Sequence, residues 1–81
     1  MNGITYKTEH LQHNEVLVVM NDPLWRSPWF LKDVRNGKYS WTRNDLFAKG
    51  FSPKTAAKHK NALEHGADKE WEFFHNEWAK F

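Results

Sequence analysis

At 81 residues the chain has the length of one domain, and that length lies near the lower limit for a self-sufficient hydrophobic core. Cysteine is absent, which excludes disulfides and thiolate metal sites and fits a cytoplasmic protein. No apolar run approaches the roughly 20 residues that a membrane span needs, and the N-terminus lacks a signal-peptide pattern, so we expect no membrane partner.

The net charge of +2 conceals three sections of different sign. Residues 1–25 carry a net charge of −2, and residues 61–81 carry a net charge of −3. Residues 26–60 hold nine Lys and Arg against two Asp, a net charge of +7. A concentrated basic section between acidic ends is typical of a surface that faces a polyanion. The alternative is that the basic section pairs with the acidic tail.

The first part of the chain predicts a β-hairpin over residues 1–20. Residues 4–8 alternate apolar and polar positions, and residues 16–20 form a continuous apolar run rich in β-branched side chains. The polar residues 10–14 between these two runs are typical of a turn. Pro23 ends the second strand, and Asp22 is placed to cap one short helical turn.

Residues 23–81 predict short helices, beginning with one over residues 29–35. Ser27 supplies a capping hydroxyl, and Pro28 occupies the first helical position, where no amide donor is lost. Phe30, Leu31 and Val34 then lie on one side, and Asn36-Gly37 ends the helix with residues that tolerate positive φ.

Two further helices are expected on either side of Gly50. Thr42 and Asp45 resemble a capping box that opens a helix over residues 43–49. Ser52-Pro53 predicts the next helix, which runs to residue 65 and stops at Gly66.

The last helix is predicted to open at residue 67 or 68. An apolar stripe runs along it and is expected to face the core, with docking on a partner protein as the alternative. The stripe consists of Trp71, Phe74, Trp78 and Phe81. The sequence therefore predicts a single α+β domain of residues 1–81 that is mostly helical, with the hairpin followed by three to four short helices.

Residues 42–65 have the order of elements that a helix-turn-helix requires. Gly50 allows the chain to reverse, Phe51 fills the angle between the helices, and Ala56 lets them approach closely. In this motif the N-terminal half of the second helix enters the major groove, where lysines and hydroxyls bind phosphates or bases. The side chains expected to contact nucleic acid are Arg43, Lys49, Ser52, Lys54, Thr55, Lys58, His59 and Lys60.

Within this segment, residues 45–46, 50–52 and 55–56 read Asp-Leu, Gly-Phe-Ser and Thr-Ala. They resemble small helix-turn-helix proteins of phages and integrative elements, including excisionase-like and regulatory factors. The resemblance covers about a quarter of the chain. It implies a regulator or accessory factor that binds double-stranded DNA. The small size of the chain is compatible with a homodimer on paired half-sites. The sequence departs from the pattern at Asp45, Lys49 and His59, where apolar residues are common.

A protein-binding effector is the alternative function, for example an anti-CRISPR-like phage inhibitor of a host nucleic-acid enzyme. Its partner would be a host protein or a nucleoprotein complex. Tryptophan and arginine dominate the centres of protein interfaces. The side chains that would form such a patch are Trp25, Arg26, Trp29, Arg35 and Trp41, and exposed tryptophans would favour this function.

Nothing in the sequence indicates catalysis, so we expect a protein that is not an enzyme and needs no cofactor. His10 and His13 lie three residues apart but lack a fixed third ligand, so no metal site is expected. The four glycines are scattered rather than gathered in a phosphate-binding loop. A small basic ribonuclease of the toxin type would be dominated by a sheet, which disagrees with the predicted helices. A purely structural domain of a larger assembly is the third option.

Overall fold

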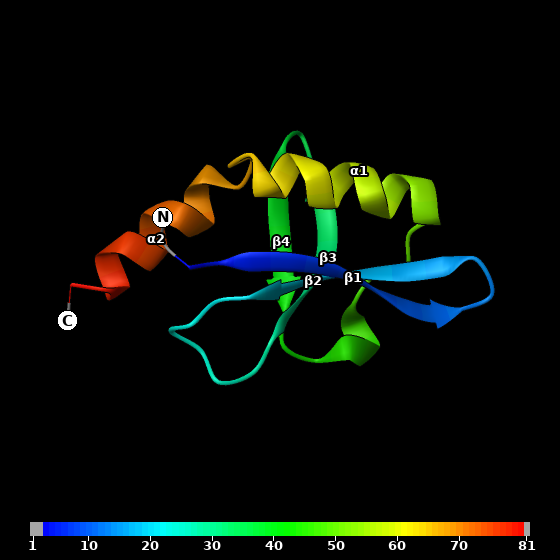
Figure 1. Ribbon diagram of the computed structural model, residues 1–81, viewed down its shortest axis with the longest axis horizontal. Coiled ribbons are helices and arrows are strands. Elements are labelled where there is room, and N and C mark those ends of the chain that lie inside the picture. Colours follow the sequence, from blue (N-terminus) through cyan, green and yellow to red (C-terminus); the bar gives the residue numbers. More distant parts are fainter. Residues whose placement is uncertain (1–2, 81) are drawn as a thin grey trace.

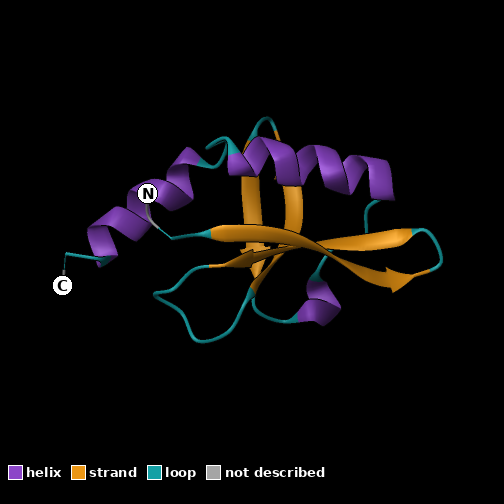
Figure 2. Ribbon diagram, viewed as in Figure 1, coloured by secondary structure: helices purple, strands orange, loops and turns teal. Residues whose placement is uncertain are grey.

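The computed structural model describes residues 3–80 as a four-stranded antiparallel sheet followed by two α-helices (Figure 1). Neighbouring strands in the chain are neighbours in the sheet, in the order β1-β2-β3-β4. The elements are β1 (Thr5–Gln12), β2 (Glu15–Asn21), β3 (Trp29–Arg35), β4 (Lys38–Thr42), the 3-10 turn η1 (Asp45–Phe47), α1 (Pro53–Glu64) and α2 (Lys69–Trp78). Strands and helices contribute comparable lengths of chain, so the expectation of a mostly helical fold is wrong (Figure 2).

Residues 29–35 form the strand β3 and not the predicted helix. Asn36 and Gly37, expected to end that helix, instead connect β3 to β4 as a two-residue turn with φ values of 51° and 76°. Two consecutive positive φ values match the right-handed twist of paired strands, which is why Asn-Gly favours tight hairpins. Asn36-Gly37 does mark a turn, but this turn connects two strands and does not end a helix.

Residues 43–49 also lack the predicted α-helix and contain only the single turn η1. After this turn the chain extends along two strands, because the Lys49 amide donates to the Leu31 carbonyl at 3.1 Å. Phe51 and Val16 exchange both of their backbone hydrogen bonds, at 2.8 and 2.9 Å. With only one 3-10 turn and no α-helix in residues 43–49, the helix-turn-helix predicted over residues 42–65 is not formed.

The predicted N-terminal hairpin and the last two helices are confirmed. β1 pairs with β2 from Thr5↔Asn21 to Gln12↔Glu15. The Ser52 hydroxyl caps α1 by accepting from the Thr55 amide at 3.3 Å. These elements form as predicted because their signals are local: alternation, a cap and, for α1, proline at its first turn.

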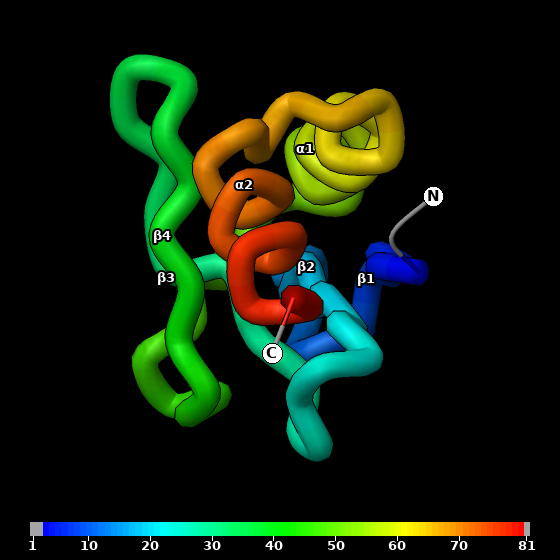
Figure 3. The backbone as a smooth tube through the Cα atoms, turned by 90° about the vertical axis from the view of Figure 1, so that its left-hand side faces the viewer, coloured from blue at the N-terminus to red at the C-terminus, as the bar shows by residue number. Residues whose placement is uncertain are grey.

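α1 lies in the angle between the β1–β2 and β3–β4 hairpins (Figure 3). Its inner face joins both hairpins in one buried cluster made of Val18, Leu31, Phe51, Ala56 and Leu63. Phe51 enters this cluster from the extended segment after η1, so that segment helps to close the core. Within residues 3–80, neither α-helix has the length or the apolar composition needed to cross a bilayer.

Candidate functional site

All five tryptophans of the chain belong to one aromatic cluster that joins four segments. Trp25 comes from the β2–β3 loop, Trp29 from β3, Trp41 from β4, and Trp71 and Trp78 from α2. Ring centroids lie 5.1 Å apart for Trp29–Trp71, 5.5 Å for Trp25–Trp78 and 5.6 Å for Trp71–Trp78, all with edge-to-face geometry. Edge contacts suit the quadrupoles of aromatic rings. We call these five residues the tryptophan cluster.

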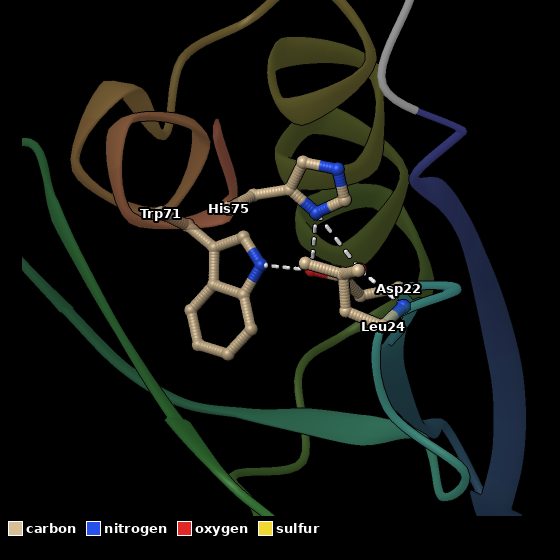
Figure 4. A network of polar contacts seen from close by, with 4 residues as sticks. All are labelled: Asp22, Leu24, Trp71 and His75. Carbon is tan, nitrogen blue, oxygen red and sulfur yellow. Dashed lines mark hydrogen bonds and ion pairs between the residues drawn. The ribbon is translucent and has the colours of Figure 1, made fainter. Parts of the chain in front are cut away.

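A buried carboxylate fixes α2 to the β2–β3 loop beside this cluster (Figure 4). Asp22 accepts from the Leu24 amide at 2.9 Å and from the Trp71 indole at 2.8 Å. His75 places Nδ1 2.9 Å from both oxygens of the same carboxylate. Asp22 and His75 are almost fully buried, so this pair connects elements of the fold and presents no reactive group to solvent.

The sequence indicated only part of this arrangement. Asp22 caps a short turn as expected, through the Leu24 amide. The buried side of α2, however, carries Trp71 and His75, whereas Phe74 of the predicted stripe is 42% exposed. Phe81, the last member of that stripe, lies outside the described residues. The spacing of four residues between Trp71 and His75 was the available signal, because these positions share one helix face.

A second carboxylate holds α2 to β4. Asp68 accepts the Trp41 indole N–H at 2.7 Å and the Trp71 amide at 3.1 Å, which also caps the N-terminus of α2. Burial raises the pKa of Asp68 above its usual value, and the two hydrogen bonds oppose this rise.

Arg43 lies on the tryptophan cluster rather than on a DNA-binding helix. Its guanidinium stands 5.5 Å from the ring centre of Trp25 and 5.4 Å from that of Trp29. Both distances lie within the range of cation–π attraction. Next to this stack, a cavity of about 340 Å³ is lined by Leu24, Trp25 and Trp78.

Five cations form what we call the basic surface: Arg35, Lys38, Lys49, Lys54 and Lys58. All five are exposed. Arg35 and Lys38 face each other at the end of the β3–β4 hairpin. Lys54 and Lys58 lie one turn apart on α1, on the side opposite the buried residues of that helix.

The charge of Lys49 acts on groups of both α1 and the β3–β4 hairpin. Burial lowers the pKa of the His59 imidazole below its usual value, and the charges of Lys58 and Lys49 lower this pKa further. Desolvation acts to raise the pKa of Asp33, but hydrogen bonds from the Val34 amide and from Arg35 lower it below its usual value. The charge of Lys49 lowers the same pKa. Lys49 lies between the hairpin and α1, because its amide bonds to Leu31 of β3 and its Nζ lies 5.6 Å from the ring centre of Phe51, which packs on His59 of α1.

The other residues predicted to contact nucleic acid have roles inside the fold. Ser52 and Thr55 bond to each other through their hydroxyls, at 2.9 Å, in the cap of α1. His59 packs its ring against Phe51 at a centroid distance of 5.1 Å. Lys60 pairs with Glu64 at 3.0 Å.

The alternative protein-binding patch is not assembled as predicted. Trp25, Trp29 and Trp41 are half-buried in the tryptophan cluster, and the Trp41 indole is engaged by Asp68. Arg35 lies at the far end of β3 from Trp29 and pairs with Asp33 at 2.7 Å. Arg26 is exposed. The arginine that does lie on the tryptophans is Arg43, which had been assigned to the nucleic-acid surface.

Among residues 3–80 there is no group of three or more His, Asp or Glu that could hold a metal ion. A small basic ribonuclease of the toxin type was expected to disagree with a mostly helical fold, and the four-stranded sheet removes this disagreement. No protein-family model matches the chain, and neither the curated proteins nor the solved structures include a match.

Proposed function

We propose that this protein is a non-enzymatic nucleic-acid-binding module, acting as a regulator or accessory factor, and that the basic surface contacts phosphates. The observation that supports the proposal is the exposure of the five cations and the scarcity of ion pairs among them. All are exposed, and Arg35 is the only one that forms an ion pair within residues 3–80. Within residues 3–80, Lys54 and Lys58 form no ion pair with the acidic C-terminal section, whereas Lys60 of the +7 section pairs with Glu64 of that section.

Exposed cations of this kind bind a polyanion by displacing condensed counterions. The five cations come from a hairpin end, an extended segment and a helix. Cations spread in this way can contact successive phosphates of a nucleic-acid backbone, and they do not require a helix in the major groove. The expectation of duplex DNA rested on the helix-turn-helix, which is absent. Phosphate contact, common to DNA and RNA, is what the basic surface supports.

Titration of a fluorescently labelled oligonucleotide at several salt concentrations tests the proposal. Five phosphate contacts give a slope of log K against log salt of about −4.5, since each contact contributes about −0.9 on B-DNA. The double variant Lys54→Gln/Lys58→Gln should weaken binding and reduce the magnitude of the slope by about 1.8.

The matched control is Lys7→Gln/Lys69→Gln, which removes the same charge from β1 and α2, outside the basic surface. This control should retain most of the affinity and the slope. A response that does not depend on salt, or equal losses in the two double variants, would show that the basic surface is not the binding site.

A protein-binding effector is the second candidate, and η1 is the observation that favours it. Leu46 and Phe47 are 85% and 66% exposed, although large apolar side chains are usually covered in a folded protein. The turn that presents them is held by the Asn44 side chain, which accepts from the Leu46 amide at 3.0 Å. Binding to a host protein that persists after nuclease treatment and is lost in Leu46→Ser/Phe47→Ser would support this function.

A further inference from the structure

The cavity between the β2–β3 loop and α2 has walls suited to a flat, apolar group. Leu24 and Trp78 are 43% and 39% exposed, so the cavity opens to solvent. The rings of Trp25 and Trp78 meet at 86° and form a corner, in which a planar ring can stack on one indole and meet the edge of the other. Its volume of about 340 Å³ exceeds what a single aromatic ring system requires.

A positive charge lies on Trp25, which forms one wall of this corner. Arg43 has no ion pair within residues 3–80, and its guanidinium is positioned by the two indole rings beneath it. A guanidinium held in this way presents its remaining N–H groups to an oxyanion in a fixed plane. The complementary ligand therefore combines a planar ring with an anionic group close to it.

We propose that this cavity receives an unpaired nucleobase while Arg43 binds an adjacent phosphate. The inference rests on the proposed nucleic-acid function and makes it more specific, because a base within a duplex cannot leave its stack without a cost. Arg43 follows the C-terminal end of β4, and Lys38 of the basic surface begins that strand. A single strand lying along β4 can therefore contact both regions, and the protein is expected to prefer single-stranded over fully paired nucleic acid.

Anisotropy titrations of the full chain with three labelled probes, each repeated at several salt concentrations, test the inference. The probes are a twelve-nucleotide oligothymidylate, an abasic phosphate chain of the same length, and a duplex of the same length. We expect the oligothymidylate to bind about tenfold more tightly than the abasic chain, which is the loss expected for one stacking contact. It should also bind more tightly than the duplex and quench tryptophan fluorescence.

Trp78→Ala should lower the affinity for oligothymidylate to that for the abasic chain and leave the abasic affinity unchanged. Phe73→Ala is the matched control, because Phe73 is an exposed aromatic residue of the same helix that does not line the cavity. Arg43→Gln, which keeps every ring in place, should weaken binding of both single-stranded probes. Far-UV circular dichroism of each variant checks that the fold is retained.

Equal affinities for oligothymidylate and the abasic chain would overturn the base site. The phosphate-binding function would remain intact if both slopes were about −3.5, since each of five contacts contributes about −0.7 on a single strand. Absence of salt-dependent binding to any probe would overturn the proposed function as well. The protein could instead bind none of the three oligonucleotides but bind a peptide that contains tryptophan and aspartate. If Trp78→Ala abolished that peptide binding, the cavity would be assigned to a protein partner.

Discussion

The tryptophans differ in whether the indole N–H has an acceptor. Trp41 and Trp71 each donate to a carboxylate, whereas the indole nitrogens of Trp25 and Trp29 are buried with no acceptor within residues 3–80. A hydrogen bond to a charged acceptor contributes roughly 1.5–3 kcal/mol, and a buried donor without an acceptor costs about 1–3 kcal/mol. Similar rings in one cluster therefore make different contributions to stability.

Replacing tryptophan by phenylalanine isolates this difference, because it removes the N–H and keeps an aromatic ring. We expect Trp41→Phe to lower the free energy of unfolding by about 1–3 kcal/mol more than Trp29→Phe does, since only the former removes one of the two donors of a buried carboxylate. Urea denaturation of the two variants measures the difference. Equal losses would mean that the Asp68 hydrogen bond adds nothing beyond ring packing.

The protonation of His59, which lies on α1 and packs against Phe51, makes the stability of the protein depend on pH. Its pKa is lowered in the folded protein by burial and by Lys58 and Lys49, so the folded protein binds this proton less readily than the unfolded chain. The stability that neutral His59 contributes is complete above the unfolded pKa of about 6.5 and is lost as the pH falls through the lowered folded pKa.

The wild-type protein should therefore lose more stability between pH 7.5 and pH 5 than His59→Gln loses over the same interval. The comparison uses the difference between the two pH values, so any constant cost of the substitution cancels. Urea midpoints at both pH values provide the measurement. An equal loss in the two proteins would place the acid sensitivity elsewhere in the chain.

At the scale of elements, Asp22 is one of the groups that attach α2 to the rest of the fold, through Trp71 and His75. Asp22→Ala would leave the Trp71 indole, the Leu24 amide and the His75 ring without their shared acceptor. Because these groups are at least partly buried, we expect a loss of about 2–5 kcal/mol, with α2 the first element to lose amide protection. Hydrogen exchange distinguishes this result from a uniform loss. Asp45→Asn, on the exposed turn η1, is the control and should change stability little.

β3 could not be identified from spacing because its pattern imitates a helix. The register of β3 against β4 shifts between Leu31 and Asp33, so one additional residue is accommodated there. This bulge brings Leu31 and Val34, three positions apart, to the same inner face, which is the spacing of a helix turn. A regular strand would have placed them on opposite faces. By contrast, α1 and α2 carried local caps and were predicted within a few residues.

The candidate site shows the same division between local and long-range information. Exposure of Lys54 and Lys58 follows from the periodicity of α1, and the sequence predicted it. The position of Lys49 between the hairpin and α1 depends on the bond from its amide to Leu31, which joins residues 18 positions apart. The stacking of Arg43 on Trp25 and Trp29 likewise requires the closed sheet, so no local pattern could predict it.

At the scale of the whole molecule, two structural regions share the strand β3. The tryptophan cluster joins α2 to the sheet. α1 packs on β1 and β2, and α2 lies beyond one end of α1 (Figure 1). Leu31 belongs to the core under α1, and Trp29 of the same strand belongs to the tryptophan cluster. β3 therefore links both regions mechanically, and neither has a large buried core of its own.

We consequently expect a single cooperative unfolding transition. Tryptophan fluorescence reports the region around α2, and far-UV circular dichroism reports all helices and strands, so the two urea curves should coincide for a two-state protein. The shared strand makes separate unfolding unfavourable, because releasing Trp29 exposes neighbours of Leu31. If fluorescence changed at a lower urea concentration than circular dichroism, α2 and the tryptophan cluster would be an independently unfolding unit, and the link through β3 would be weaker than its packing indicates.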